Sequence, residues 1–425
     1  MPSSTPRIAI VGGGPAGLTL GALLHARRIP FTVYELRGRP TAHEWAQPSG
    51  MLDMHEHDGL RALRACGLYD AFLPLTGECS EQFVIADSDG APTPGMGGAQ
   101  KDEEEPAAKK RKDEEGARPE ISRNNLTKLL LSKVPEESVR WGAKLQTAAW
   151  RDGTTTLEFA NGEKSEFDLV VGADGAWSRV RTLLTPVRPR YGNSQIVTAT
   201  IRGVTTKYPH LAALVGSGSY MALGYRHAVV SQRGPLDSAR IYLWLTTTDE
   251  KLGVTAGLSG KPPTAAIAKL LDNDKYLGKF GPVVKELAET ALREEEKETG
   301  GAGLDIRGLY ALPYGLRWEG KKGVAVVGDA AHVMLPNGEG VNQAMLDATL
   351  LAEHIVQAWD EDKGPGFGDV LKPLVDGFET DMAQRAVKVG EETEQLLGMM
   401  LGEDAGDKMG KFFEGHEEEE KKNEQ

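Results

Sequence analysis

The stretch Arg7–Glu35, RIAIVGGGPAGLTLGALLHARRIPFTVYE, decides the fold of this chain. It opens with a short β-branched run that is typical of a buried parallel strand. A glycine-rich turn, a helical stretch over Leu18–Arg28 and a second strand over Pro30–Glu35 follow. This order of elements predicts a βαβ unit, and therefore an α/β protein with a parallel sheet.

The turn in this unit has the spacing G-x-G-x-x-G. Gly12 allows the tight turn, Gly14 lets a pyrophosphate approach the backbone, and Gly17, next to Ala16, lets the helix pack closely on the strand. Glu35 ends the second strand, where a carboxylate accepts hydrogen bonds from the ribose of an adenosine. The unit therefore predicts a dinucleotide site.

Two later stretches also place glycine at the end of a buried strand. Val324–Ala348, VAVVGDAAHVMLPNGEGVNQAMLDA, contains a strand, a polar loop and a helix pattern from about Val341 to Trp359. Asp168–Arg181, DLVVGADGAWSRVR, has a strand that ends before Asp174 and is expected to continue into a helix. Helix N-termini attract anions. Glycine-rich turns at both ends of the chain indicate one extended ligand held from two sides.

Length, charge and cysteine content narrow the protein class. A chain of 425 residues can build two domains, and its net charge of −13 disfavours nucleic acid as a partner. The two cysteines, Cys66 and Cys79, indicate buried free thiols in a reducing compartment. Neither a membrane-spanning apolar run nor a secretory signal is visible, so we expect a cytoplasmic protein without an integral membrane span.

The middle of the chain predicts a second domain. Alternating residues from Gln195 to Leu245 indicate antiparallel strands, and Asp249–Glu298 is expected to be helical. We interpret Gly301–Gly308 as a linker, although its glycines resemble a nucleotide loop. The predicted division is residues 1–190 and 308–362 for the Rossmann-like domain, 191–307 for a mixed-sheet substrate domain, 363–413 for a C-terminal helix and 414–425 for a disordered tail.

A flexible charged insertion is expected at about residues 89–119. It contains the basic run Lys109–Lys112, for which a nuclear localisation signal is the alternative to a solvated loop. Acidic residues on both sides favour the loop.

Four motifs together resemble the FAD-dependent aromatic hydroxylases of the para-hydroxybenzoate hydroxylase type. They are GGGPAG with Glu35, Arg123 in ISRNNL, GADGAWSRVR, and GDAAHVMLPNGEGVNQAMLDA. Within that group, SGMLDMHEHDGLRALRACGL and EISRNNLTKLLL are most similar to the tetracycline-inactivating flavin monooxygenases. The resemblance implies a Rossmann-like FAD-binding domain with an inserted substrate domain.

The resemblance also implies roles for individual residues. The first glycine turn would take the FAD pyrophosphate, and Glu35 the adenosine ribose. Asp53 and Arg123 would lie beside the ribityl chain and the ring, and Asp329 would bind the ribityl side. Asp174 would contact both FAD and the nicotinamide. The backbone N–H groups at the start of the last helix would face the pyrimidine edge of the flavin: Gly340, Val341 and Asn342.

Simpler interpretations stay open for several of these residues. Asp174 could cap the following helix, Arg123 could be a surface residue at a helix start, and Asp53 could belong to a turn. His332 is expected to be a packed structural histidine. In the second domain we predict catalytic roles for Arg202 and Tyr225 and substrate contact for Arg226 and His227, with a solvated strand face as the alternative for all four. Substrate contact is also predicted for Pro336, in the loop that follows Asp329.

Three positions depart from the family. Glu339 stands where glutamine is usual, Leu36 replaces a basic residue, and Ala46 replaces an arginine that is expected to hold NADPH. Clear matches to the substrate-anchoring arginine and histidine are also missing from Gly216–Arg233, so we do not expect tetracycline to be the natural substrate. A carboxylate pointing at the flavin would oppose its reduced anion; we therefore predict that Glu339 faces solvent or a basic partner.

The resulting prediction is an enzyme of the class A monooxygenase type. The resemblance implies that NAD(P)H, with NADPH preferred, reduces FAD, and that a C4a-hydroperoxyflavin hydroxylates an electron-rich aromatic, enolic or polycyclic small molecule with oxygen from O₂. No metal is expected, and the protein is expected to be a monomer or weak dimer. The alternatives are a flavin-dependent reductase or halogenase, although no W-x-W-x-I segment is present, or a non-catalytic FAD-fold binding protein.

Overall fold

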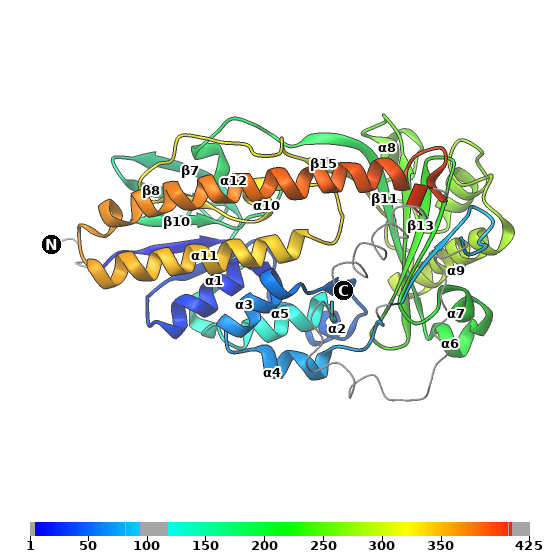
Figure 1. The fold of residues 1–425 in the computed structure, drawn as a ribbon, viewed down its shortest axis with the longest axis horizontal. Helices are drawn as coiled ribbons and strands as arrows, with labels where there is room; N and C mark the ends of the chain where they lie inside the picture. The colour runs from blue at the N-terminus through cyan, green and yellow to red at the C-terminus, as the bar shows by residue number, and fades with distance from the viewer. Residues whose placement is uncertain (1–4, 81, 94–117, 407, 410–425) are drawn as a thin grey trace, which may run out of the picture.

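The computed structural model describes residues 5–80, 82–93, 118–406 and 408–409. The basic run Lys109–Lys112, most of the predicted insertion and the predicted tail lie outside the described residues. The described residues form two lobes, each built on one large β-sheet (Figure 1). No helix among the described residues is long and apolar enough to cross a membrane.

The first lobe contains the predicted parallel sheet, with strand order β16-β10-β1-β2-β6. Its central strands are buried on both faces, which explains their continuous β-branched composition. The carboxyl ends of β1 and β10 lie side by side, because Val11 pairs with Gly172. The bounds are β1 Ile8–Val11, β2 Thr32–Glu35, β6 Val139–Trp141, β10 Leu169–Gly172 and β16 Val324–Val326.

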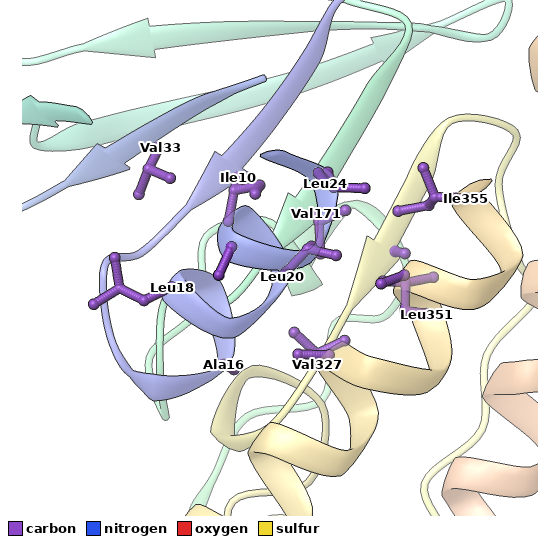
Figure 2. Close-up of a cluster of buried hydrophobic side chains, with 14 of the residues drawn as sticks. Ile10, Ala16, Leu18, Leu20, Leu24, Val33, Val171, Val327, Leu351 and Ile355 are labelled. Carbon is purple, nitrogen blue, oxygen red and sulfur yellow. The ribbon is translucent and has the colours of Figure 1, made fainter. Parts of the chain in front are cut away.

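Two helices that are far apart in the sequence cover this sheet together. Helix α1, Pro15–Ala26, packs against α11, Gly340–Glu361. Figure 2 shows Leu20 and Leu24 of α1 near Leu351 and Ile355 of α11, with both helices packed beside the strands of the sheet. All four side chains are fully buried. This packing brings both predicted anion-binding helices to the same sheet edge.

Shorter elements complete the first lobe. The long helix α12, Phe367–Met400, lies along α11 and extends to the second sheet (Figure 1). The remaining bounds are α2 Ala42–Ala46, β3 Met51–Asp53, η1 Glu56–Leu60, α3 Arg61–Ala65, α4 Tyr69–Phe72, η2 Leu73–Leu75, β5 Glu120–Ser122, α5 Arg123–Leu131, η3 Glu136–Ser138, β7 Leu145–Arg151, β8 Thr154–Phe159, β9 Lys164–Phe167, η4 Arg181–Leu183 and α10 Asp329–His332.

The second lobe is a six-stranded mixed sheet in the order β15-β11-β14-β13-β12-β4. One face packs against helices, and the other faces the first lobe and the end of α12. The bounds are β4 Phe83–Ala86, β11 Arg190–Arg202, α6 Val204–Lys207, α7 Pro209–Val215, β12 Ser219–Gly224, β13 His227–Gly234, β14 Ser238–Thr246, α8 Leu252–Thr255, η5 Ile267–Leu271, α9 Pro282–Thr299 and β15 Asp305–Ala311.

Two expectations from the sequence were wrong. Gly301–Gly308 is not only a linker, because β15 begins at Asp305 and pairs with β11. The alternating sequence of β15 fits an edge strand, and its pairing partner lies about a hundred residues earlier. The expected helix after Asp174 is also absent, and this segment consists of turns followed by η4. Both outcomes depend on contacts with distant segments.

Candidate functional site

The carboxyl ends of β1, β10 and β16 lie side by side at one edge of the sheet. The turn that follows β1 requires glycine at two positions. Gly12 has a φ of +112°, and a Cβ on it would lie 2.1 Å from the carbonyl oxygen of Ala173 after β10. A Cβ on Gly17 would lie 2.0 Å from the carbonyl oxygen of Gly12. The turn after β1 therefore lies directly against the backbone that follows β10 and against the first turn of α1, as the glycine spacing predicts.

Gly14 differs from these two glycines. A Cβ built on it meets no atom within 4 Å, so there is open space in front of the residue. Gly14 also occupies the N-cap position of α1, where no side-chain oxygen caps the helix. The first N–H groups of α1 are thus directed toward a space that a phosphate could fill.

Glu35 lies beside this turn. Its side chain is buried, and one carboxylate oxygen accepts a hydrogen bond from the backbone N–H of Gly13 at 2.6 Å. The other accepts from the backbone N–H and from the Nε of Arg37, at 3.0 and 2.9 Å. Each carboxylate oxygen has two lone pairs, so the oxygen that Gly13 contacts can accept one more hydrogen bond, from a ligand hydroxyl. Arg37 supplies a cation next to Leu36, which is exposed.

The side chains of Asp329 and Arg123 are both exposed to solvent. Even so, burial among neighbouring protein atoms is the largest influence on the pKa of each. Burial raises the pKa of Asp329, against the opposing charges of His332 and Arg123. Burial lowers the pKa of Arg123, whereas the nearby Tyr242 and Asp329 raise it. Their mutual influence shows that the structure brings these two predicted site residues together.

The start of α11 is fastened to the segment after β3. The Asn342 side chain accepts from the backbone N–H of His55 and donates to the carbonyl of Asp53, both at 2.9 Å. Among the described residues, no side chain caps α11 at its N-cap residue, Glu339. The prediction for Glu339 is confirmed, because its carboxylate lies 3.3 Å from the imidazole of His55, a basic partner.

Asp174 is occupied by its own turn. Its carboxylate accepts from the hydroxyl of Ser178 at 2.5 Å and from the backbone N–H of Arg179 at 2.7 Å. Burial raises the pKa of Asp174, and these hydrogen bonds act in the opposite direction. The buried side chain of Arg181 donates to the carbonyl of Ala330, which connects this turn to the segment that carries Asp329.

Sequence reasoning missed a buried ionic network that supports the Asp329 segment. Asp347 of α11 is 1% exposed and accepts from the backbone N–H of Gly328 at 3.0 Å. It also accepts from His332 at 2.6 Å and Arg385 at 2.8 Å. The only signal in the sequence is an acid within the apolar face of a helix. His332 is held in this network, which accords with the structural role expected for it.

The predicted catalytic and substrate residues of the second lobe are not brought together. Arg202, at the end of β11, lies 3.5 Å from Glu295 and 3.9 Å from Glu298. Tyr225 and Arg226 form the turn between β12 and β13, and Tyr225 is half exposed.

His227 is buried and accepts from the backbone N–H of Thr246 at 3.1 Å. Its other ring nitrogen lies 3.0 Å from the carbonyl oxygen of Lys275, and burial lowers its pKa. These contacts lie within the second lobe. Pro336 is exposed in the loop between α10 and α11.

A different part of the second sheet faces the site. Arg240, Tyr242 and Trp244 alternate along β14, so their side chains share one face. Arg240 and Tyr242 both influence the pKa of Arg123. The same face packs against Leu335 from the loop before α11. The indole N–H of Trp244 is buried and has no hydrogen-bond partner within the described part of the chain. The alternation is visible in the sequence, but the orientation of the face is not.

Comparisons with known proteins agree with this arrangement. The family model described as FAD binding domain matches residues 5–256. Monooxygenase penA of Penicillium thymicola is 32% identical over 448 residues, which covers 96% of this chain and 98% of that protein. Monooxygenase asqM of Emericella nidulans is 31% identical over 447 residues, and the match covers 94% of this chain and 97% of that protein. The crystal structure of CtdE in complex with FAD and a substrate has a TM-score of 0.71 at 17% identity, over 94% of this chain and 90% of that one, which shows a shared fold.

Proposed function

The chain belongs to the FAD-binding domain family, and from this premise we propose that it is an FAD-dependent monooxygenase. It takes electrons from NAD(P)H and inserts one atom of O₂ into an electron-rich aromatic, enolic or polycyclic compound. One observation carries the proposal: the open space at Gly14 lies at the same strand ends from which Asp329 follows β16, and Arg123 is near enough to influence the pKa of Asp329. The full-length relatives penA and asqM are named monooxygenases.

The residues of the site fit the cofactor. The open space at Gly14 accommodates a pyrophosphate, and a side chain there would fill it. Glu35 retains one lone pair for a ribose hydroxyl. Asp329 and Arg123 bind along the ribityl chain, and the first N–H groups of α11 meet the pyrimidine edge of the ring. Asp174 acts indirectly, by shaping the turn after β10.

Bound FAD supplies the redox chemistry, because it accepts a hydride and activates O₂. The protein binds the cofactor, orients it toward the substrate and adjusts its reduction potential. The N-terminus of α11 has a partial positive charge and stabilises negative charge at the adjacent ring edge by roughly 0.3–2 kcal/mol.

The substrate binds against the β14 face. Tyr242 and Trp244 provide aromatic area, and the partly exposed side chain of Tyr242 adds a phenol O–H that can donate. Arg240 adds a cation nearby, with its guanidinium 5.8 Å from the centre of the Tyr242 ring. This combination selects a flat substrate with an acceptor oxygen, such as a phenol or an enol. We no longer assign catalysis to Arg202 or Tyr225, nor substrate binding to Arg226 or His227.

The first experiment is a spectrum of the purified protein, which should be yellow with FAD. NADPH oxidation is then screened with phenolic and polyketide-like compounds, with NADH in parallel, and the product is analysed after reaction under ¹⁸O₂. Colourless protein that takes up no FAD would refute the proposal. FAD-dependent NADPH oxidation without ¹⁸O in any product would favour the reductase alternative.

The substrate face is tested with Tyr242→Phe. This variant keeps the aromatic packing but removes the phenol donor, whose net contribution to binding is about 1 kcal/mol. We expect KM for the best screened substrate to rise about fivefold, with little loss of stability because the ring is kept. Tyr225→Phe, the same substitution in the exposed turn, is the matched control. Equal KM values for the two variants would contradict the assignment of Tyr242.

A further inference from the structure

Glu339 is the one acidic residue at the N-cap of α11, the helix end that we propose faces the flavin ring. An unpaired carboxylate there would cancel the positive end of the helix dipole, which amounts to about half an elementary charge. The structure gives it a partner. The Nδ1 of His55 lies 3.3 Å from the Oε1 of Glu339, and the Nε2 of His55 lies 2.7 Å from the Oδ2 of Asp53.

Both ring nitrogens of His55 therefore face carboxylates. Carboxylates only accept hydrogen bonds, and only the imidazolium form has two N–H donors. Burial lowers the pKa of His55, but the hydrogen bonds and charges of Asp53 and Glu339 outweigh it and raise the pKa to about 9. His55 is thus a cation at neutral pH, held between two anions.

The cluster is rigidly joined to the helix end. The side chain of Asn342 bonds to the backbone of both His55 and Asp53. A Cβ on Gly59 would lie 2.5 Å from the Asn342 oxygen, so glycine is needed for this contact. The His55 side chain is only 13% exposed. The three charged groups cannot rearrange freely, and their net charge acts at a fixed position.

A metal ion is a weaker interpretation of the same cluster. Ligand atoms of His55, Asp58 and Glu339 lie within 4.8 Å of one another. However, a metal ligand must be a neutral imidazole with a free nitrogen, and both nitrogens of His55 are engaged. The Asp58 carboxylate also accepts a hydrogen bond from Gln343. We assign no metal.

We propose that His55 is a positioning residue that neutralises Glu339 beside the start of α11 and thereby preserves the ability of this helix end to stabilise reduced FAD. The proposal rests on the FAD site of the proposed function. With His55 protonated, Asp53, His55 and Glu339 carry a net charge of about −1; without the proton the charge is about −2. The second negative charge opposes reduction of a neighbouring flavin.

This arrangement couples reduction to a proton. Reduction places negative charge near His55 and so raises its affinity for a proton. Above pH 9, where the oxidised protein has lost this proton, reduction takes it up again, and the midpoint potential falls more steeply with pH. The charged groups that face the cluster include Asp58 and His57 of η1 and Arg385 of α12, besides Asp53 and Glu339.

The test compares midpoint potentials and FAD dissociation constants of the holoprotein from pH 7 to 10. His55→Gln protein should still bind FAD, but it should bind the reduced form at least tenfold more weakly relative to the oxidised form. For a two-electron couple this lowers the midpoint potential by about 30 mV or more. The double variant His55→Gln/Glu339→Gln should return to the wild-type potential at pH 7. His210→Gln, which breaks an exposed pair with Glu286 in the second lobe, is the matched control and should be unchanged.

Unchanged potential in yellow His55→Gln protein, or a double variant that does not recover, would overturn this inference alone. Wild-type protein that takes up no FAD would overturn both it and the proposed function. If His55→Gln does not fold, the wild-type protein still decides the question. A steeper potential above pH 9 supports the proton uptake, and a slope without a break there refutes it.

Discussion

Gly14→Ala separates the role of the first glycine turn in folding from its role in binding. The backbone of Gly14 is extended, with φ −80° and ψ −176°, which alanine adopts without strain. The added methyl meets no protein atom within 4 Å. Alanine caps helices less well than glycine, but it also restricts the unfolded chain by about 0.4–1 kcal/mol. These effects oppose each other, so the stability of the apoprotein should change by less than about 1 kcal/mol.

FAD binding should respond differently, because the methyl occupies the space proposed for the pyrophosphate. Loss of one hydrogen bond to a charged group costs about 1.5–3 kcal/mol, so the dissociation constant for FAD should become roughly 10 to 150 times larger. Flavin fluorescence titration measures this constant directly. Thermal unfolding gives an independent value of this constant. An FAD concentration about 100 times the wild-type dissociation constant stabilises the wild-type protein by about 2.7 kcal/mol. At the same concentration, a variant that binds FAD tenfold more weakly is stabilised by about 1.4 kcal/mol.

The matched control is Gly377→Ala, which adds a methyl to an equally open position on the exposed side of α12. It should stabilise the helix by about 0.5–1 kcal/mol and leave FAD affinity unchanged. Gly14→Ala protein that binds FAD within a factor of about two of wild type would refute the assignment of this turn to the pyrophosphate. Apoprotein that loses several kcal/mol would show that the space at Gly14 is not open.

Three further predictions concern buried charges and thiols. Asp347→Asn removes the buried charge that pairs with the partly buried His332 and Arg385, and it should lower the free energy of unfolding in urea by about 3 kcal/mol. Asp369→Asn, which breaks an exposed pair, should cost less than about 1 kcal/mol, and similar losses for the two variants would contradict the assigned network. Burial raises the pKa of Glu294, but hydrogen bonds from two lysines and a tyrosine outweigh it and lower the pKa to about 2. The folded state therefore gains stability from Glu294 above its ordinary pKa of 4.5 and loses it as the pH falls toward 2, so acid unfolding of Glu294→Gln should depend less steeply on pH in that window; an identical slope would exclude this contribution. Burial also raises the pKa of Cys66 and Cys79, so the native protein at pH 8 should show no rapid reaction with a thiol reagent, and the denatured protein should show two reactive thiols; fast labelling of the native protein would mean that these side chains are accessible.

The local part of the cofactor site could be predicted from the sequence because its determinants are local. Gly12, Gly14 and Gly17 lie within one strand–turn–helix, and Glu35 ends the next strand. Neighbouring residues alone dictate where such a turn needs glycine and which strand follows. The later stretch with Asp329 follows the same rule, since a strand, a glycine and a helix start are adjacent in the chain.

Orientation was harder to predict than position. Tyr225 and Tyr242 both lie in or beside predicted strands, but Tyr225 is in an exposed turn and Tyr242 faces the first lobe. A strand alternates its side chains between two faces, and the sequence does not state which face will be covered by another domain. The substrate residues predicted from the sequence and those proposed from the structure therefore lie in different parts of the sheet.

The sequence by itself determined the parallel sheet, the glycine turns and the helix that starts at Gly340, because short-range backbone sterics and hydrophobic periodicity specify them. Only the tertiary structure decided which charges meet. His55 bonds to Asn342 across 287 positions, and Glu339 finds its cation on that same distant segment. Such pairs arise when α11 packs beside the segment after β3, and no local rule relates their positions in the chain. The charge next to the proposed flavin site is therefore a property of the packing.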